Sequence, residues 1–388
     1  MLRFLTAGES HGPTLTAIIE GVPAGFAVHV EQINHDLARR QKGYGRGGRM
    51  AIERDEVRVL SGVRFGCTTG GPVTLTVENK DFKNWHKRMS IDPADRGAAQ
   101  PVTRPRPGHA DLAGVLKYNL DDIRDVLERA SARETTARVA VGSFARQLLS
   151  PFGIEVLGYV VSIGATVVQA PAAHELSALR ETAEQSPVRV PDRDAEAAII
   201  AEIDACKQTG DTLGGVVEVT ATGLPAGLGS YAQWDRKLDG RLAYALLSLQ
   251  AAKGVELGLG FRAAAMRGSA LHDEIGYDQE RRRFLRLSNN SGGTEGGMST
   301  SEPLRARVAF KPLSTLMQPL RSVDIKTKQP AVGTIERSDV CAVPAAAVIA
   351  ETVVAFELAK AFLEKFGGDS LAEITRNYEG YLEQVRNF

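Results

Sequence analysis

Two histidines lie in glycine- or proline-rich segments that could present a side chain to a ligand. His11 stands in the segment GESHG directly after a β-type run, and its flanking glycines let the backbone bend tightly. In the segment RPRPGHAD, two prolines ahead of His109 hold the chain extended, so Arg104 and Arg106 are expected to point the same way. Histidine exchanges protons near neutral pH, and guanidinium groups bind phosphate or carboxylate. The first segment could therefore present a catalytic histidine, and the second could bind a phosphate or carboxylate. The alternatives are a turn histidine bonded to the backbone at His11 and a proline-rich surface turn with solvated arginines at 104–111.

Further arginines gather in the glycine-rich segment RRQKGYGRGGRM, which holds Arg40, Arg46 and Arg49. Its glycines match the spacing of a dinucleotide-binding loop, but a helical run, and not a strand, precedes them. RNA-binding RGG tracts have a similar amino-acid sequence, although this run is short and the chain carries no net charge. A loop that offers backbone N–H groups and arginines to a small anion fits the segment better.

A second anion site is indicated by the segment RASARETT, which starts at Arg129. Ser131 and Glu134 have the spacing of a capping box, and a helix N-terminus with adjacent arginines is a prepared anion site. An ordinary capped helix with salt-bridged arginines is the alternative. The segments KPLST (311–315) and RSDVC (337–341) look ordinary when taken alone, and Cys341 is expected to be buried and not a nucleophile.

Across these segments, arginines and histidines gather in loops, whereas acidic residues lie mostly on helices. The chain of 388 residues carries 47 basic and 47 acidic residues, so its formal charge is zero. A neutral chain has no global field that attracts nucleic acid or a membrane surface. The clustering therefore predicts a local cationic pocket for a small polyanionic ligand.

The remaining composition excludes several classes of protein. Three distant cysteines without a CxxC pair argue against a disulfide scaffold or a zinc site, and no metal site is expected. The N-terminus has no apolar stretch of signal-peptide length, and charged residues interrupt the most apolar window, 342–363. The sequence thus predicts a soluble, cytoplasmic protein that binds neither nucleic acid nor membranes.

Strands and helices must position these segments. Runs rich in β-branched and aliphatic residues predict strands at 3–7, 14–19, 57–60, 73–77, 156–163, 216–222, 284–287 and 304–310. Apolar spacing predicts helices near 31–41, 137–148, 199–206, 238–249 and 355–366, the last of them ended by Gly367. Asp194 is expected to cap the third of these helices. No linker divides the chain and several strands follow one another directly, so we expect one large α+β unit over residues 1–388, with helices covering sheets.

Seven segments occur in the same order as in the chorismate synthase family, and the chain resembles that family from residue 1 to about 375. They are GESHG (8–12), RRQKGYGRGGRM (39–50), RPRPGHAD (104–111), RASARET (129–135), the loop 292–298, KPLST (311–315) and RSDVC (337–341). Each segment alone is a weak signal, but seven in order argue against an accidental match. The resemblance implies a β-α-β sandwich of helices and antiparallel sheets that assembles as a homotetramer.

The resemblance also implies the elimination of phosphate from 5-enolpyruvylshikimate 3-phosphate to give chorismate. Reduced FMN would be required without net redox change, NADPH would serve only as a reductant, and the compact length predicts dependence on an outside source of electrons. The implied catalytic residues are His11, His109 and Asp339. His11 would protonate the departing phosphate, His109 would hold or protonate the reduced ring, and Asp339 would accept a proton.

Binding residues follow from the same motifs. Flavin contacts are expected at Arg129, Ala130, Ser131, Gln250, Ala251, Gly296, Lys311, Pro312, Leu313, Ser314, Thr315 and Arg337. The phosphate of either the substrate or NADP is expected at Arg40, Arg46, Arg49 and Arg133. Two rival functions stay open: a flavin-dependent reductase or oxidase that uses the same pocket, and a nucleic-acid-binding protein that uses the glycine–arginine loop.

Overall fold

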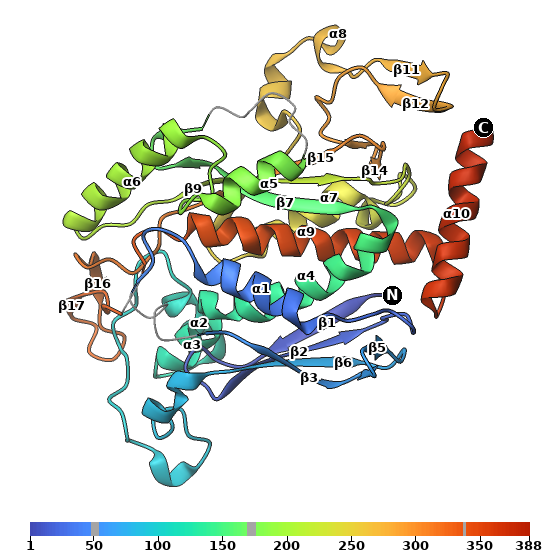
Figure 1. Cartoon of the computed structure of the whole chain (residues 1–388). Helices are drawn as coiled ribbons and strands as arrows, with labels where there is room; N and C mark the ends of the chain where they lie inside the picture. The colour runs from blue at the N-terminus through green and yellow to red at the C-terminus, as the bar shows by residue number, and fades with distance from the viewer. Residues whose placement is uncertain (48–53, 169–175, 337–338) are drawn as a thin grey trace.

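The computed structural model describes residues 1–47, 54–168, 176–336 and 339–388, and in it two antiparallel sheets lie on either side of a layer of helices (Figure 1). The first sheet has the strand order β1-β2-β6-β3. Its strands are β1 (Arg3–Ala7), β2 (Thr14–Glu20), β3 (Val57–Ser61) and β6 (Val73–Glu78). Leu15, Ala17 and Ile19 of β2 are buried, as the period-two pattern of a sheet with one covered face requires.

The second sheet has the strand order β10-β15-β9-β7-β8. Its strands are β7 (Glu155–Ile163), β8 (Thr166–Val167), β9 (Gly215–Thr222), β10 (Ala252–Leu257) and β15 (Leu304–Phe310). Helix α9 (Val343–Phe366) covers one face of β7 and β9, and α5 (Leu176–Gln185) packs on the other face against Leu157 and Tyr159. Because both faces are covered there, β7 is buried almost throughout and reads as a continuous apolar run.

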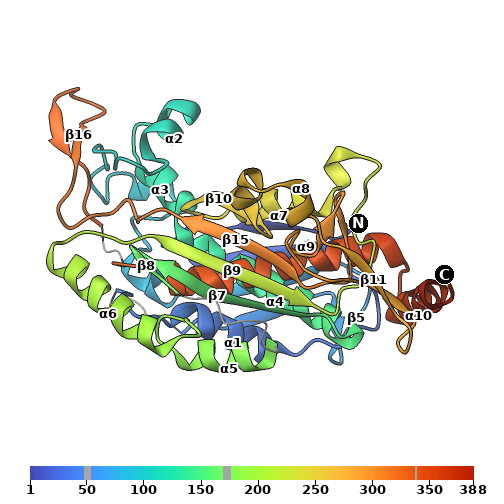
Figure 2. The same ribbon diagram turned by 90° about the horizontal axis from the view of Figure 1, so that it is seen from above.

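The helical layer consists of α1 (Val30–Gln41), α4 (Thr135–Leu149) and α9, and Figure 2 shows it beneath the strands of the second sheet. α9 is apolar and buried on nearly every side, because it lies between the two sheets. Its backbone approaches α4 so closely that a Cβ added at Gly142 would lie 2.1 Å from the carbonyl oxygen of Thr352. Within the described ranges, no helix combines the length and apolar character that a membrane span needs.

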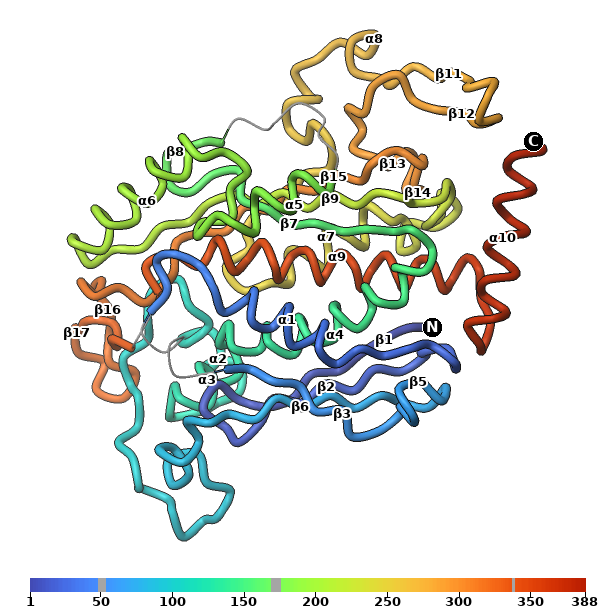
Figure 3. Tube along the Cα trace, in the orientation of Figure 1, coloured from blue at the N-terminus to red at the C-terminus, as the bar shows by residue number. Residues whose placement is uncertain are grey.

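The other elements surround this sandwich. The helices are α2 (Asp111–Tyr118), α3 (Arg124–Ala130), α6 (Arg193–Gln208), α7 (Leu238–Leu247), α8 (Gly268–Leu271) and α10 (Leu371–Asn387). Four short hairpins are formed by β4 (Val63–Arg64) with β5 (Cys67–Thr68), β11 (Ile275–Asp278) with β12 (Arg283–Arg286), β13 (Thr294–Glu295) with β14 (Met298–Ser299), and β16 (Arg321–Val323) with β17 (Pro330–Val332). Figure 3 shows that the hairpin β16–β17 lies at the same end of the molecule as α2 and α3.

Charged side chains from all three helices form a network inside the helical layer. Arg39 of α1 donates hydrogen bonds to both oxygens of Glu351 on α9, at 2.8 and 2.9 Å, and to Asp36 at 2.8 Å. Arg146 of α4 bonds to the same two carboxylates. Burial alone would raise the pKa of Glu351, but the two arginines hold it well below its usual value. The ionised Glu351 thus joins α1 and α4 to α9.

The structure confirms the predicted α+β class and each predicted strand, with ends displaced by at most one residue. The five predicted helices are also present, although the one near 238–249 ends at Leu247 and those near 199–206 and 355–366 begin at Arg193 and Val343. The prediction that Asp194 caps α6 is wrong: Asp192 has the extended backbone of a cap, and its carboxylate accepts the N–H groups of Asp194 and Ala195. The helix α10, the strand β10 and most of the short hairpins were not predicted.

Replacing Glu351 by alanine is expected to lower the free energy of unfolding by about 3–5 kcal/mol, because the buried Arg39 would lose its main partner. Equilibrium unfolding in urea measures this change. Glu357→Ala on the same helix is the matched control. Burial raises the pKa of Glu357, and Lys360 pairs with it only at 3.7 Å, so a loss of about 1 kcal/mol or less is expected. Equal losses in the two variants would contradict the role given to the network.

Candidate active site

Several segments that carry the predicted chemistry meet at the end of the molecule where α2 and α3 lie (Figure 3). The backbone N–H of Ser10 donates to the carbonyl oxygen of Glu128 at 3.0 Å, and Ser131 lies 3.2 Å from Ser10 between the two hydroxyl oxygens. On the other side, the hydroxyl of Ser314 donates to the carbonyl oxygen of Gly108 at 2.8 Å. The loop after β1 therefore contacts α3, and the loop that carries His109 contacts the segment 311–315.

His11 lies beside a buried carboxylate. Gly8, three residues earlier, has a φ of 106°, which allows the turn after β1. The Nδ1 atom of His11 lies 2.9 Å from Oε1 of Glu128, whose side chain is 1% exposed, and Arg124 donates to the same oxygen at 3.0 Å. Burial would raise the pKa of Glu128, but the bonds from His11 and the charge of Arg124 lower it below its usual value. His11 therefore faces an ionised carboxylate.

His109 has a similar environment. Its Nδ1 atom lies 2.5 Å from Oδ1 of Asp111, at the first residue of α2. Arg106 donates through Nε to Oδ2 of Asp111 at 2.8 Å and through Nη1 to the hydroxyl of Thr315 at 3.0 Å. Burial would raise the pKa of Asp111, but the hydrogen bonds from His109 and Arg106 hold it well below its usual value. Each histidine thus shares a carboxylate with an arginine.

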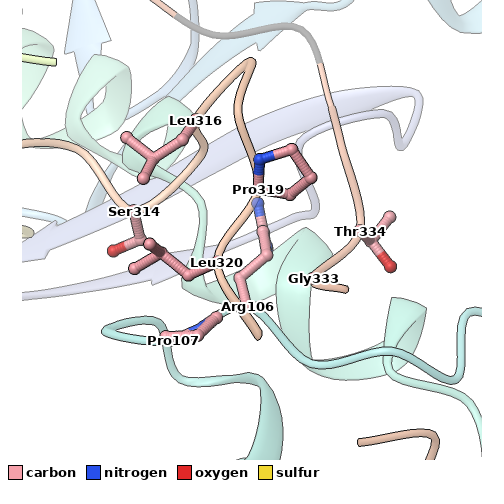
Figure 4. Close-up of a pocket in the computed structure, with 8 residues that line it drawn as sticks. All are labelled: Arg106, Pro107, Ser314, Leu316, Pro319, Leu320, Gly333 and Thr334. Atoms are coloured by element: carbon pink, nitrogen blue, oxygen red, sulfur yellow. The ribbon is translucent and has the colours of Figure 1, made fainter. Parts of the chain in front are cut away.

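A small pocket separates the His109 loop from the segment after β15. Figure 4 shows its lining residues, which are Arg106, Pro107, Ser314, Leu316, Pro319, Leu320, Gly333 and Thr334. The prediction that Arg104 and Arg106 point the same way is wrong, because Arg106 is buried on Asp111 and Arg104 is exposed. Thr334 holds the backbone here by donating both its N–H and its hydroxyl to the carbonyl oxygen of Arg104.

Glu134 links the predicted flavin contacts at 129–131 and 250–251. It accepts hydrogen bonds from Gln250 and from the hydroxyl of Thr6, and Arg129 donates to that same hydroxyl. Arg129, whose side chain is exposed, donates to the carbonyl oxygens of Thr6 and Gly8 at 2.9 and 3.1 Å. Ala130 is the last residue of α3. Gln250 donates to Glu134 at 3.2 Å, and the carbonyl oxygen of Ala251 accepts the backbone N–H of Lys311 at 2.9 Å.

The capping box predicted at Ser131 and Glu134 is wrong. Ser131 caps only the 3-10 turn Ala132–Glu134, by accepting the N–H of Arg133, and α4 begins at Thr135. Glu134 turns instead toward Thr6, Arg138 and Gln250, because these groups offer donors to its buried carboxylate.

The predicted phosphate ligands Arg40 and Arg133 converge on Asp55. Arg133 donates to Asp55 at 2.7 Å, while Arg40 lies 3.7 Å from it and donates to the hydroxyl of Thr135 at 2.9 Å. Burial lowers the pKa of Arg40 to about 9, and the nearby charges of Arg46 and Arg133 act in the same direction. A buried cation beside two others is a favourable site for an incoming anion.

Arg46 and Asp339 are paired at this site. Their side chains lie 3.1 Å apart, and Asp339 also accepts the backbone N–H of Gly47 at 2.7 Å. The pair joins the glycine–arginine loop to the segment ahead of α9. The predicted residues Arg49 and Arg337 lie outside the described residues.

The segment 311–315 follows β15 and faces the His109 loop. Lys311 donates to Ser314 at 2.8 Å, and burial together with the charge of Lys253 lowers the pKa of Lys311. The carbonyl oxygen of Pro312 accepts from Lys311 at 3.3 Å, and that of Leu313 accepts from the hydroxyl of Thr212 at 2.8 Å.

Gly296 does not join the other predicted flavin contacts. It lies in the turn of β13–β14, where its φ is 59°. The neighbouring Gly297 accepts the backbone N–H of Leu238, so this hairpin sits beside the start of α7, away from α2 and α3 (Figure 3).

Sequence reasoning missed the partners of the predicted residues. Glu128, Arg124 and Trp85 surround His11, and Asp55 pairs with Arg133. The sequence predicts Asp111 only as a helix start, although its two-residue distance from His109 is a local signal for a contact. The other partners lie far away along the chain, and no spacing rule connects them.

Two buried atoms indicate that the site can bind a ligand with both donors and acceptors. Among the residues that the structure describes, Oε1 of Gln250 and Nη1 of Arg40 are two of the buried side-chain atoms that have no hydrogen-bond partner, although Nη1 of Arg40 lies 3.7 Å from the carboxylate of Asp55. A buried polar group without a partner is unfavourable unless a ligand or water bonds to it. An acceptor beside 129–131 and a cation beside Asp55 suit a ligand that carries N–H groups and phosphate, as a flavin mononucleotide does.

Asp111→Asn is expected to destabilise the protein more at pH 7 than at pH 3. The pKa of Asp111 is lowered in the folded state, so the charged form stabilises the fold above the unfolded value of about 4, and this contribution is lost as pH falls. The difference in unfolding free energy between wild type and variant should shrink by about 1 kcal/mol, measured in urea at both pH values.

Asp125→Asn on α3 is the control, because its effect on stability should change with pH in the opposite direction. Burial and the charge of Asp122 raise the pKa of Asp125, so the wild type should gain stability relative to this variant as pH falls. A pH-independent difference for Asp111→Asn would contradict the ion pairing seen at α2.

Comparison with known proteins agrees with these motifs. A protein-family model described as chorismate synthase matches residues 2–363. The chain is 62% identical over 389 residues to a chorismate synthase of Symbiobacterium thermophilum, with 99% of each chain covered. It is 58% identical to one of Geobacter metallireducens, with 100% of each covered. A crystal structure of a chorismate synthase has a TM-score of 0.81 and 43% identity, and the match covers 100% of this chain and 99% of that one. The chain therefore belongs to the chorismate synthase family.

Proposed function

We propose that the protein is a lyase that eliminates phosphate from 5-enolpyruvylshikimate 3-phosphate to form chorismate, the last common step of aromatic amino acid biosynthesis. The observation that carries this proposal is the pair of histidines, His11 and His109, each bonded to a buried carboxylate and an arginine. A departing phosphate needs a proton and positive charge, and a histidine among guanidinium groups supplies both. The family assignment supports the same reaction.

Reduced FMN is the cofactor that we propose for this site. When bound, it would lend an electron as phosphate leaves and regain one as the C6 hydrogen departs, so no net reductant is consumed. The proposed contacts are Arg129, Ala130, Ser131, Gln250, Ala251 and the segment 311–315, which hydrogen bonds and shared loops bring near one another. Gly296 and Arg337 stay predictions of the same kind.

His11 is the proposed acid for the departing phosphate. Arg40, Arg46, Arg49 and Arg133 are the proposed ligands of a phosphate, either of the substrate or of NADP. The depressed pKa of the buried Arg40 supports this assignment, because a phosphate would relieve the repulsion among the clustered cations. Asp55, which pairs with both Arg40 and Arg133, offsets part of the positive charge of these two side chains when no anion is bound.

His109 and Asp339 have the other two proposed proton roles. Because Asp111 is ionised, His109 must donate from Nδ1, which leaves Nε2 as the nitrogen that can hydrogen-bond or protonate the reduced ring. Asp339 is the proposed proton acceptor. Its bonds to Arg46 and to the N–H of Gly47 hold the carboxylate in a fixed orientation.

We further propose that residues 1–388 form one domain and that the active protein is a cytoplasmic homotetramer. The continuous core that runs from the first sheet through the helical layer to the second sheet supports a single domain. NADPH would act only as a reductant of FMN. Because the chain has the compact length of the family, we expect FMN to be reduced by an outside source of electrons.

Anaerobic release of phosphate from 5-enolpyruvylshikimate 3-phosphate tests the proposed function. With reduced FMN we expect release to continue over many turnovers without consumption of NADPH, and with oxidised FMN we expect none. Oxidation of NADPH in step with substrate conversion would favour a reductase instead. Tight, salt-sensitive binding of RNA that the phosphorylated substrate does not displace would favour the nucleic-acid-binding alternative.

Replacing His11 or His109 by alanine is expected to lower kcat by about 10²–10⁴-fold, the usual contribution of a positioned acid. Both variants should fold and bind FMN, because each histidine lies in a loop outside the sandwich. Steady-state phosphate release and flavin titration measure the two properties. His35→Ala is the control, since its side chain is 71% exposed on α1. Wild-type rates in both loop variants would refute the proposed roles.

A further inference from the structure

We propose that Glu128 is a positioning residue for His11: it holds the proton on Nδ1, so that Nε2 is the atom that delivers a proton to the leaving group. This inference rests on the proposed function of His11 as the acid. It adds a residue that lies 117 positions away in the chain and that none of the sequence motifs includes.

Glu128 binds His11 at two points. Its carboxylate accepts the backbone N–H of His11 through Oε2 at 2.8 Å, and both oxygens lie near Nδ1 of the ring, at 2.9 and 3.0 Å. The backbone carbonyl oxygen of Glu128 also accepts the N–H of Ser10 at 3.0 Å. One residue of α3 therefore fixes both the loop that carries His11 and the rotation of its ring.

The charge of Glu128 decides which ring nitrogen carries a proton. Burial would raise the pKa of Glu128, but the bonds from His11 and the charge of Arg124 lower it, so the carboxylate is ionised near neutral pH. An ionised carboxylate only accepts hydrogen bonds. Nδ1 of His11 must therefore be the donor, and the proton that the ring exchanges is the one on Nε2.

The ring of Trp85 restricts the remaining freedom of His11. The two rings stack with centroids 3.8 Å apart and an angle of 25° between their planes. Trp85 is itself held, because its Nε1 donates to Asp81 at 3.0 Å, and the guanidinium carbon of Arg124 lies 5.3 Å from its centroid. Such packing around an acid reduces the orientational freedom that must be lost on the way to the transition state.

Arg124 prevents the carboxylate from binding the imidazolium too strongly. It lies one helical turn before Glu128 on α3 and donates to Oε1 at 3.0 Å. The charge of Glu128 is thus shared between Arg124 and His11. A carboxylate that is shared with a permanent cation still orients the imidazole ring. A carboxylate without such a cation would stabilise the imidazolium more strongly and make it a weaker acid.

The tautomer of His11 in the wild-type enzyme gives the first test, and this measurement does not depend on activity. Nitrogen–proton correlation spectra of enzyme with isotope-labelled histidine distinguish neutral imidazole protonated on Nδ1 from imidazole protonated on Nε2. The signal of His11 is the one that disappears in His11→Ala. We expect the Nδ1–H tautomer; the Nε2–H tautomer would overturn the proposal.

Glu128→Gln keeps the shape of the side chain but presents one acceptor oxygen to three donors. We expect kcat for anaerobic phosphate release to fall about tenfold to hundredfold, less than for loss of the acid itself, with unchanged KM. The Nε2–H tautomer of His11 should also become populated. Glu218→Gln is the matched control, because Glu218 is an equally buried carboxylate that binds Arg305 and Arg307 on the second sheet. It should change neither property.

The double variant His11→Ala/Glu128→Gln separates positioning from a general structural role. If Glu128 acts through His11, the second substitution should cause no further loss of kcat in the His11→Ala background. Losses that multiply would overturn the proposal and leave the proposed function intact. A His11→Ala enzyme with wild-type turnover would overturn both. An unchanged rate in Glu128→Gln with a slow His11→Ala would overturn the positioning role alone.

Discussion

The buried carboxylate of Glu351 is the interaction on which the helical layer depends. It accepts hydrogen bonds from Arg39 of α1, from Arg146 of α4 and from the backbone N–H of Gly158 in β7. Desolvation of a charge is unfavourable by several kcal/mol unless every lone pair has a partner, so these elements cannot slide along α9 without a large loss. One side chain therefore sets the relative position of three helices and a strand.

The same interaction determines where the cationic part of the site lies. Arg39 and Arg40 are consecutive residues of α1, about 100° apart around the helix axis. Because Arg39 is bonded to Glu351, Arg40 must point toward the start of α4, where it meets Thr135 and the carbonyl oxygen of Ala132. The glycine–arginine loop begins directly after α1, so its path toward Asp339 starts from this fixed point.

The local sequence pattern was sufficient to predict an element where residues close together in the chain determine its structure. The strand β15 and the C-terminal half of α9 could be predicted because the spacing of apolar residues within each element indicates its type. Prediction failed where two local options competed and sequence spacing did not decide between them. Asp192, and not Asp194, caps α6 because the backbone of Asp192 is extended. The side chain of Arg106 points away from that of Arg104 because Arg106 is bonded to Asp111.

Most partners in the candidate site could not be predicted because they lie far apart along the chain. Asp55 lies 78 residues from Arg133, and nothing in either segment points to the other. The motifs predicted ligand-contacting residues mainly in loops, where glycine and proline give the sequence a recognisable pattern. They did not identify Glu128 and Arg124 of α3 or the coil residue Asp55, which pair with those residues and carry no distinctive local sequence pattern. Glu128 is such a residue, in a seven-residue helix of unremarked sequence.

The two histidines differ in how much of the fold each requires. Arg106, His109 and Asp111 lie within six consecutive residues, so two prolines and the first turn of α2 are enough to bring them together. His11 meets Glu128 and Arg124 only after the first sheet has packed on the helical layer and α3 has docked beside it. The acid proposed for the leaving group is therefore complete only in the fully folded chain.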